Sequence, residues 1–138
     1  FVLPKPQIME DSAKVPGLDG EKMSKSYNNT IEVFEELKPQ RKKIMRITTD
    51  SRPMEQPKDP ETDPLFQLYR LLATPEERDE LAAIYRAGNF GYGMVKTKLA
   101  DAAERYFADA RARRAEYAAD PDRVRAILAD GAARARRK

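Results

Sequence analysis

Hydrophobic residues recur at helical spacing through most of the chain after residue 63. Apolar side chains three, four and seven positions apart lie on one face of a helix, where they can be buried together. Four such faces can be drawn, formed by Leu65, Leu68, Tyr69 and Leu72; by Leu81, Ile84 and Tyr85; by Val95, Leu99, Ala103, Tyr106, Ala110 and Tyr117; and by Val124, Ile127, Leu128, Gly131 and Ala135. The pattern predicts four helices, the third from about residue 93 to residue 119, packed as a small bundle.

Residues that typically begin a helix precede three of these faces. Asp63 and Asp120 suit the N-cap position, and each is followed by a proline, which fits the first helical position. Thr74 is also followed by a proline, and Glu77, three residues later, completes a capping box. We therefore expect helices to begin directly after these three cap residues.

The first 50 residues show a different pattern. Thr30–Phe34 alternates apolar and polar positions, which is typical of a short strand. Leu37 to Ile47 predicts a helix, whose basic face we interpret mainly as solvated, with phosphate contact as the alternative; this face consists of Arg41, Lys42, Lys43 and Arg46. Residues 50–63 contain three prolines and no apolar periodicity, which predicts a linker or a long loop. We place a boundary there, between the tail of a larger domain (1–50) and a helical domain (51–138).

Composition narrows the chemistry that the chain can perform. Its 138 residues include no Cys and no His, which excludes disulfides, thiolate metal sites, Cys nucleophiles and Ser-His-Asp triads. Asp59, Glu61 and Asp63 are close in sequence, but nothing enforces a coordination geometry, so we expect no metal site. No apolar run approaches the roughly 18 residues of a membrane span, and the first residues lack the apolar core of a secretory signal. Neither a membrane partner nor secretion is expected.

The net charge of +3 is distributed unevenly along the chain. Residues 105–138 carry ten basic and five acidic residues, and most of the basic ones are arginine. Such asymmetry indicates either an anionic partner or a solvated helix face. Arginine planes often read RNA loops. The candidate RNA contacts in this segment are Arg111, Arg113, Arg114, Arg123 and Arg125. For Phe90 and Tyr92, in a glycine-rich turn, we favour local packing over stacking on bases.

One segment combines two lysines with hydroxyl side chains and a glycine turn. It reads Gly17-Leu18-Asp19-Gly20-Glu21-Lys22-Met23-Ser24-Lys25-Ser26. Two ammonium groups can reach one polyanion such as a triphosphate, and hydroxyl and backbone N–H groups add hydrogen bonds. A lysine is a compact charge on a flexible stem, which suits stabilisation of a leaving group, and a glycine hinge lets a loop close. The segment predicts a mobile phosphate-binding loop, with an ordinary exposed basic turn as the alternative.

The five residues Lys22-Met23-Ser24-Lys25-Ser26 spell the KMSKS signature of class I aminoacyl-tRNA synthetases. With its flanking residues the chain resembles the bacterial tryptophanyl-tRNA synthetase family, from about residue 8 to its end. The matching segments are Gly17–Gly20, Asn29–Ile31, Thr49–Ser51 and Gly91–Lys96. That family joins a Rossmann-type α/β catalytic domain to a helical domain that recognises tRNA. The implied fold class is mainly α, a C-terminal helical bundle preceded by the tail of the Rossmann-type domain.

The resemblance also implies a role for each residue of the signature. The family is cytoplasmic, activates tryptophan with ATP and Mg²⁺, releases pyrophosphate and transfers tryptophan to tRNA(Trp). Lys22 and Lys25 would stabilise charge on the ATP phosphates, with Lys25 as the main group. This is electrostatic and positioning catalysis that needs no covalent intermediate. The residues that would contact the nucleotide or hold the loop are Met23, Ser24 and Ser26.

The chain departs from the family pattern in one large respect. The family's HIGH-type motif contains histidine, which this chain lacks. In the family, this motif and the tryptophan-binding residues both belong to the first half of the sequence. We therefore expect a C-terminal fragment that is inactive alone and has no ATP bound. The family forms homodimers through its catalytic domain, so we do not expect this chain alone to dimerise.

Two alternatives remain open at this point. The first is a fragment of tyrosyl-tRNA synthetase, the sister enzyme, which usually carries an additional C-terminal RNA-binding domain and often a different version of the loop. The second is a stand-alone RNA-binding module that reuses the helical domain. A module that only binds RNA has no need for a triphosphate-binding loop, so the presence of Lys22–Ser26 favours the enzyme.

Overall fold

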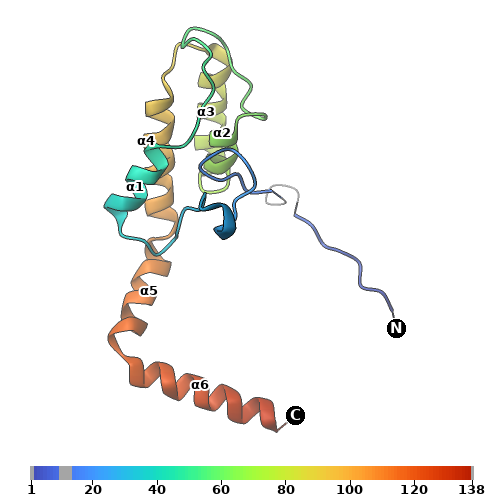
Figure 1. Ribbon diagram of the computed structural model, residues 1–138, viewed down its shortest axis with the longest axis vertical. Coiled ribbons are helices and arrows are strands. Elements are labelled where there is room, and N and C mark those ends of the chain that lie inside the picture. The colour runs from blue at the N-terminus through green and yellow to red at the C-terminus, as the bar shows by residue number, and fades with distance from the viewer. Residues whose placement is uncertain (1, 10–13, 138) are drawn as a thin grey trace. The chain divides into compact units, whose positions relative to one another are not determined.

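The computed structural model of the protein describes residues 2–9 and 14–137. Residue 1, residues 10–13 and residue 138, which the sequence analysis assigned to the domains 1–50 and 51–138, lie outside the described residues. The helices are η2 (Lys25–Tyr27, a 3₁₀ helix), α1 (Leu37–Met45), α2 (Pro64–Arg70), α3 (Pro75–Ala87), α4 (Tyr92–Tyr106), α5 (Ala108–Ala119) and α6 (Pro121–Arg136) (Figure 1). The described residues contain no β-strand, which confirms the mainly α fold class. No helix among them could cross a membrane, given their lengths and polarity.

The three predicted helix starts are confirmed. The Asp63 side chain accepts hydrogen bonds from the backbone N–H groups of Leu65 and Phe66, at 2.8 and 3.1 Å. Thr74 and Glu77 form the reciprocal capping box, since each side chain accepts a bond from the other residue's N–H. These bonds satisfy N–H groups that have no partner inside the helix, which fixes where each helix begins.

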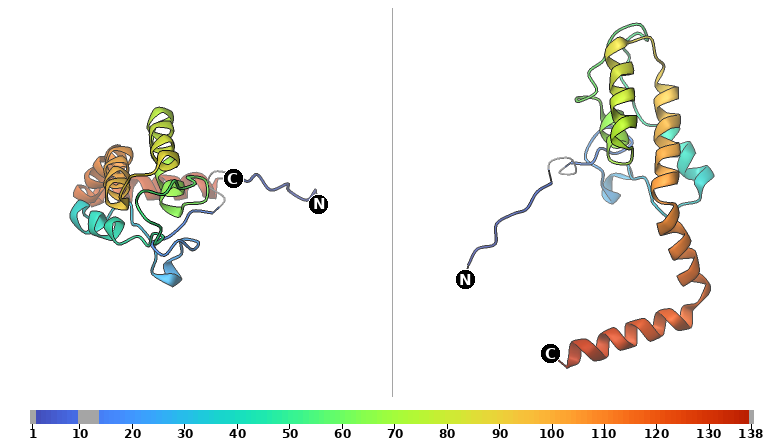
Figure 2. Two further views of the ribbon diagram at one scale, coloured as in Figure 1. Left: turned by 90° about the horizontal axis from the view of Figure 1, so that it is seen from above. Right: turned by 180° about the vertical axis from the view of Figure 1, so that it is seen from behind.

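The chain divides into two compact units, the first ending at Tyr106 and the second beginning at Phe107. In the first unit, α4 packs against both α1 and α2 (Figures 1 and 2). Ile44 and Ile47, which precede the proline-rich segment, are buried in the same core as Leu65 and Leu99, which follow it. Residues on the two sides of segment 50–63 therefore share one core. The division into domains 1–50 and 51–138 stays a prediction.

The strand expected at Thr30–Phe34 is absent, so that prediction is wrong. The chain turns there instead, with the Glu35 N–H donating to the Glu32 carbonyl at 3.3 Å. The buried Gln40 side chain of α1 also donates to the Glu32 carbonyl, at 2.6 Å. Because no neighbouring strand pairs with this segment among the described residues, its carbonyl groups bond to a turn and to a helix side chain.

The single helix expected over residues 93–119 is two helices, α4 and α5. Phe107 separates them with φ −96° and ψ 5°. The predicted apolar face is buried only in its first half, at Val95, Leu99 and Ala103, whereas Tyr106 is 60% exposed. The inward face predicted for the last helix is also wrong, because Ile127 and Leu128 of α6 are exposed. From residue 108 onward the sequence is mainly Ala and Arg, which supply helix propensity without large side chains to bury.

Candidate functional site

The segment that carries Lys22–Ser26 rises from a tight turn closed by backbone hydrogen bonds. The Gly17 N–H donates to the Glu21 carbonyl at 2.7 Å, and the Met23 N–H donates to the Val15 carbonyl at 2.8 Å. Gly20 has φ +83°, a left-handed conformation that glycine adopts without strain. The lysine-bearing segment therefore begins from a fixed base.

Asn29 holds the two sides of this base together. Its side chain accepts a hydrogen bond from the Ser24 N–H at 2.8 Å. It donates to the Asp19 carboxylate at 2.8 Å and to the Lys22 carbonyl at 3.2 Å. Asn29 is only 2% exposed, so these bonds replace the water that its amide would otherwise bind. The bond from Asn29 is the main cause that lowers the pKa of Asp19, and it thereby favours the charged carboxylate.

The five signature residues lie together on this loop, with different exposures. Lys22 and Lys25 are exposed, and within the described part of the chain neither ammonium group has an ion-pair partner. Met23 is partly buried against the hydrophobic core, so it anchors the loop. The hydroxyl groups of Ser24 and Ser26 are hydrogen-bonded to each other at 2.8 Å, across the start of η2. The arrangement leaves two free cations above an anchored base.

Thr49 and Asp50 of the matching segment Thr49–Ser51 line a pocket together with Asp19 and Gly20 from the base of the loop. The Thr48 N–H donates to the Leu18 carbonyl at 2.8 Å, which ties the end of α1 to the base of the loop. The pocket has a volume of about 380 Å³. It is lined by Asp19, Gly20, Thr48, Thr49, Asp50, Arg52, Thr62, Asp63 and Pro64.

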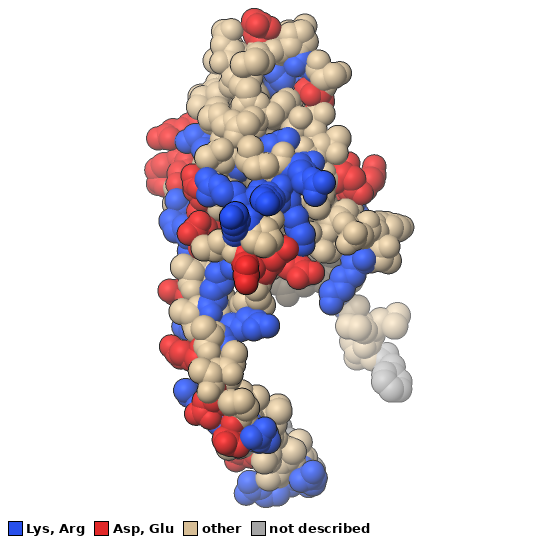
Figure 3. Space-filling view, turned by 60° about the vertical axis from the view of Figure 1, so that its left-hand side comes forward, with Lys and Arg blue, Asp and Glu red and all other residues tan. Residues whose placement is uncertain are grey.

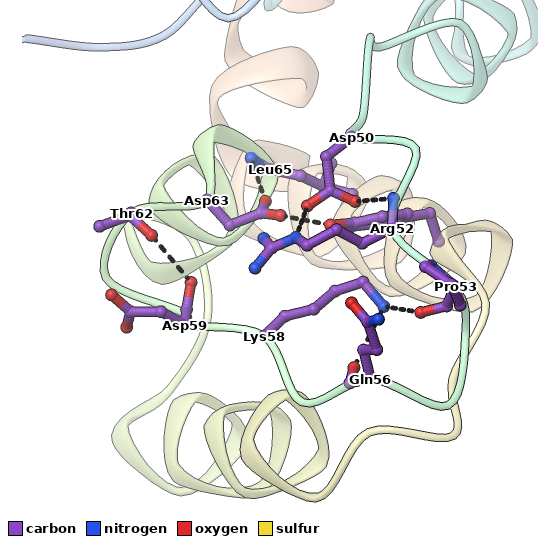
Figure 4. Close-up of polar contacts among 10 residues, drawn as sticks. Asp50, Arg52, Pro53, Gln56, Lys58, Asp59, Thr62, Asp63 and Leu65 are labelled. Atoms are coloured by element: carbon purple, nitrogen blue, oxygen red, sulfur yellow. Dashed lines mark hydrogen bonds and ion pairs between the residues drawn. The ribbon is translucent and has the colours of Figure 1, made fainter.

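The proline-rich segment is held in place by a buried lysine (Figure 4). Lys58 is 3% exposed, and its ammonium group donates to the Pro53 carbonyl at 2.9 Å. The same group lies 4.7 Å from the centroid of the Phe90 ring and 5.5 Å from that of Tyr92, within the range of cation–π attraction. These contacts confirm that Phe90 and Tyr92 have a local packing role.

Tyr92 also joins this segment to the start of α2. Its hydroxyl donates to the second carboxylate oxygen of Asp63 at 2.9 Å, so one carboxylate both caps α2 and accepts this bond. Burial is the main cause that raises the pKa of Tyr92 above its usual value, and the bond to Asp63 raises it further. Arg52 and Asp50 form an ion pair beside this group (Figure 4). The segment that the sequence predicted as a linker or long loop is a loop packed into the first unit.

The candidate RNA-contacting arginines lie in the second unit, on α5 and α6. Arg125 forms an ion pair with Asp122, and the Arg123 guanidinium lies 5.3 Å from the centroid of the Tyr117 ring. Arg113 is exposed. The three on α5 are Arg111, Arg113 and Arg114. Each of the five is therefore carried by a helix, and Arg123 and Arg125 are among those that contact a side chain of their own unit.

The sequence did not predict the structural role of Asn29, which it placed only within a matching segment, or that of Lys58. An asparagine after a turn and a lysine among prolines are usually solvated, and neither position carries a local signal of burial. Gly17 lies in the matching segment Gly17–Gly20, and the sequence did not predict a packing role for it. A Cβ atom at Gly17 would lie 2.4 Å from the Asn29 side-chain nitrogen, so the glycine is what allows Asn29 to pack there.

Comparisons with known proteins agree with this arrangement. The family model for class I tRNA synthetases (W and Y) matches residues 1–108. Tryptophan–tRNA ligase from Rhodopirellula baltica is 62% identical over 136 residues, which are 99% of this chain and 42% of that protein. The corresponding ligase from Fusobacterium nucleatum is 45% identical, with the same coverage of 99% and 42%.

A solved structure shows the same fold. The crystal structure of tryptophanyl-tRNA synthetase from Campylobacter jejuni, complexed with ADP and tryptophan, matches with a TM-score of 0.86 at 39% identity. The match covers 95% of this chain and 41% of that one. The chain thus spans well under half of the length of the relatives that it matches. Because the family model covers more than half of the chain, the chain belongs to the class I tRNA synthetases of the tryptophan and tyrosine (W and Y) family.

Proposed function

We propose that this chain supplies the ATP-phosphate loop and part of the tRNA-binding surface of a tryptophan–tRNA ligase. The whole ligase activates tryptophan with ATP and then transfers it to tRNA(Trp). The observation that carries the proposal is the pair of exposed lysines, Lys22 and Lys25, free of ion pairs within the described residues and mounted on a loop whose base is fixed by Asn29. The 62% identity to the R. baltica ligase supports tryptophan as the amino acid.

The loop stabilises the negative charge that develops on the ATP phosphates during tryptophan activation. A carboxylate oxygen of tryptophan forms a bond to the α-phosphorus of ATP while the bond from that phosphorus to the bridging oxygen of pyrophosphate breaks. Negative charge therefore grows on the departing pyrophosphate. The ammonium groups of Lys22 and Lys25 stabilise this charge, with Lys25 as the main group, and they supply no covalent intermediate.

The remaining signature residues support these two lysines. Ser24 and Ser26 offer hydroxyl groups that can exchange their mutual hydrogen bond for bonds to phosphate oxygens. Met23 keeps the loop attached to the core while its neighbours close on the nucleotide. Mg²⁺ enters with ATP as part of the substrate, and the described residues hold no cluster of three or more acidic side chains that could bind a metal by themselves.

The second part of the proposal concerns tRNA. Exposed arginines on helices suit contacts to phosphates and to splayed anticodon bases. The five proposed contacts are Arg111, Arg113, Arg114, Arg123 and Arg125. The whole ligase is expected to act as a cytoplasmic homodimer, and this chain alone is expected to be inactive, because the HIGH-type motif lies outside it.

A chimera tests the proposal without assumptions about what surrounds this chain. The 136 matching residues of the R. baltica ligase are replaced by this chain, and tryptophan-dependent exchange of pyrophosphate into ATP is measured. We expect exchange to persist, and Lys25→Gln to lower kcat by about 100-fold or more, as for other lost charge-stabilising donors. Lys14→Gln is the matched control, because this exposed lysine lies outside the signature.

Each other outcome decides against part of the proposal. Unchanged kcat in Lys25→Gln would show that Lys25 is not the main charge-stabilising group. Exchange that depends on tyrosine would favour the sister enzyme, and a chimera that binds tRNA but exchanges no pyrophosphate would favour the RNA-binding module. Tryptophan-dependent exchange by the 138-residue chain alone would contradict the expectation that it is inactive by itself.

A further inference from the structure

The outer side of α1 carries a row of cations that the proposed catalytic loop does not use. Lys38, Arg41, Lys42 and Arg46 lie on one side of the helix and extend over about 12 Å of its axis, at 1.5 Å per residue. Together with residues of α4 they line an open groove of about 780 Å³. Figure 3 turns this side of the first unit toward the viewer and shows Lys and Arg side chains gathered there.

Most of these charges are not matched within the molecule. In the described part of the chain, Lys38, Lys42 and Arg46 form no ion pair. Arg41 contacts Asp101 of α4 at 2.7 Å, but the two side chains are 44% and 58% exposed, and exposed pairs of this kind are weak. Lys42 is four residues from both Lys38 and Arg46, a spacing at which like charges destabilise a helix. An anionic partner would remove this repulsion.

Part of the basic excess of the second unit contacts side chains of that unit. Arg125 and Arg134 form ion pairs with Asp122 and Asp130, and Arg123 packs on an aromatic ring. Among the described residues, the cations of α1 that form no ion pair are those that line a groove, whereas Lys22 and Lys25 lie on the loop.

The shape and lining of the groove favour an extended polyanion over a small ligand. The groove is open along α1, so it would not enclose a small molecule. Leu37 and Met45 lie at its two ends and are 42% and 43% exposed, which offers apolar contact to sugar groups between phosphates. Glu104 is the one carboxylate among the lining residues, against four cations. A row of cations of this length can meet several phosphates of one strand.

We infer that the α1 groove binds the phosphate backbone of a structured RNA, which in the proposed ligase is the tRNA. The choice of RNA rests on the proposed function, whereas the polyanion chemistry rests on the groove itself. Because the Thr48 N–H bonds to the Leu18 carbonyl, α1 and the base of the lysine loop belong to one packed unit. RNA held on α1 is therefore held by the same unit that carries the candidate catalytic loop.

Binding of labelled tRNA(Trp) to the 138-residue chain tests this inference. The test variant is Lys38→Gln/Lys42→Gln/Arg46→Gln, and the matched control is Lys5→Gln/Arg86→Gln/Arg136→Gln, which removes the same charge at other exposed positions. We expect the test variant to lose more than about tenfold in affinity at low salt, and its slope of log K against log salt to fall by roughly 2 to 3. The control should stay within about twofold of the wild type.

A variant that keeps the charges checks that folding is intact. Lys38→Arg/Lys42→Arg should keep the wild-type slope, and no variant should unfold at a markedly lower temperature than the wild type, because the changed side chains are exposed. Unrelated tRNA should show the same loss, since phosphate contacts carry no sequence information. No RNA binding by the wild-type chain, or the same slope in test and control variants, would overturn the inference.

The chimera separates this inference from the proposed function. Pyrophosphate exchange uses tryptophan and ATP only, so the α1 variant should keep exchange while its KM for tRNA in charging rises. Absence of exchange in the unmodified chimera would reject the proposed function and leave RNA binding by α1 to be judged by titration. Normal exchange with an unchanged KM for tRNA in the α1 variant would reject the inference alone.

Discussion

The Asn29 amide donates a hydrogen bond to the Asp19 carboxylate at 2.8 Å, across a loop in which ten positions separate the two residues. Asp19 in turn accepts the Glu21 N–H at 3.0 Å, and Asn29 accepts the Ser24 N–H at 2.8 Å. The pair thus fixes the backbone before and after Lys22. A cation on a flexible side chain is positioned more precisely when its backbone is held in this way.

Replacement of Asn29 should loosen the loop. Asn29→Ala removes three hydrogen bonds and leaves the Ser24 N–H without its partner, so we expect a loss of about 1–3 kcal/mol in the free energy of unfolding. Amide hydrogen exchange should accelerate at Lys22–Ser24. Asn28→Gly is the control, because Asn28 is exposed and its φ of 52° suits glycine. Equal exchange rates in the two variants would show that Asn29 does not hold the loop.

Addition of a methyl group at Gly17 should act on the same contact. The Cβ of Gly17→Ala would lie 2.4 Å from the Asn29 side-chain nitrogen and 2.8 Å from the Asn29 backbone carbonyl oxygen. We expect a loss of about 1–3 kcal/mol or more, as for other overpacked sites, measured by denaturant unfolding. Gly93→Ala in α4 is the control, since a Cβ there meets no atom within 4 Å. A stable Gly17→Ala with unchanged hydrogen exchange would mean that Asn29 can move aside at little cost.

These contacts show where sequence reasoning succeeded and where it stopped. The starts of α2, α3 and α6 were predictable because each depends on a cap residue and a proline that are adjacent in sequence. The roles of Lys22 and Lys25 rest on the signature and stay predictions. Asn29 and Gly17 were not identified, because their role depends on a close approach between residues twelve positions apart that no local pattern encodes.

The packing of the proline-rich segment could not be predicted, for a related reason. Prolines and the absence of apolar periodicity indicate a loop, and residues 50–63 do form one, but a loop can still pack through its backbone carbonyls. Lys58 is what those carbonyls bind, and its burial depends on Phe90 and Tyr92 more than thirty residues away. The break at Phe107 was missed because alanine and arginine on both sides favour helix equally.

Removal of the Lys58 ammonium group should destabilise this segment. Lys58→Met keeps the apolar stem but leaves the Pro53 carbonyl without its donor and removes the cation beside Phe90. We expect a loss of about 1–3 kcal/mol in the free energy of unfolding. The variant is compared by thermal denaturation with Lys5→Met, which changes an exposed lysine. If Lys58→Met were as stable as this control, the burial of a paired lysine would contribute nothing net to the fold.

Glu77 should make stability depend on pH in the acid range. Hydrogen bonds from the Thr74 backbone and from Arg105 lower the pKa of Glu77 below its usual value of 4.5. A group whose pKa is lowered on folding binds its proton more readily in the unfolded chain. Its contribution to stability is therefore fully present above about pH 5 and is lost as the pH falls through the lower pKa of the folded state.

The comparison of wild type with Glu77→Gln isolates this contribution. Glutamine can keep the capping bond to Thr74 but cannot pair with the Arg105 guanidinium as an anion. We expect the wild type to unfold at a higher temperature than Glu77→Gln at pH 7, and the difference to shrink between pH 5 and pH 3. Glu80→Gln, on the same helix at an exposed position, should show no such trend. A difference between wild type and Glu77→Gln that stays constant down to pH 3 would mean that the charge of Glu77 does not contribute, and that the capping bond alone holds the start of α3.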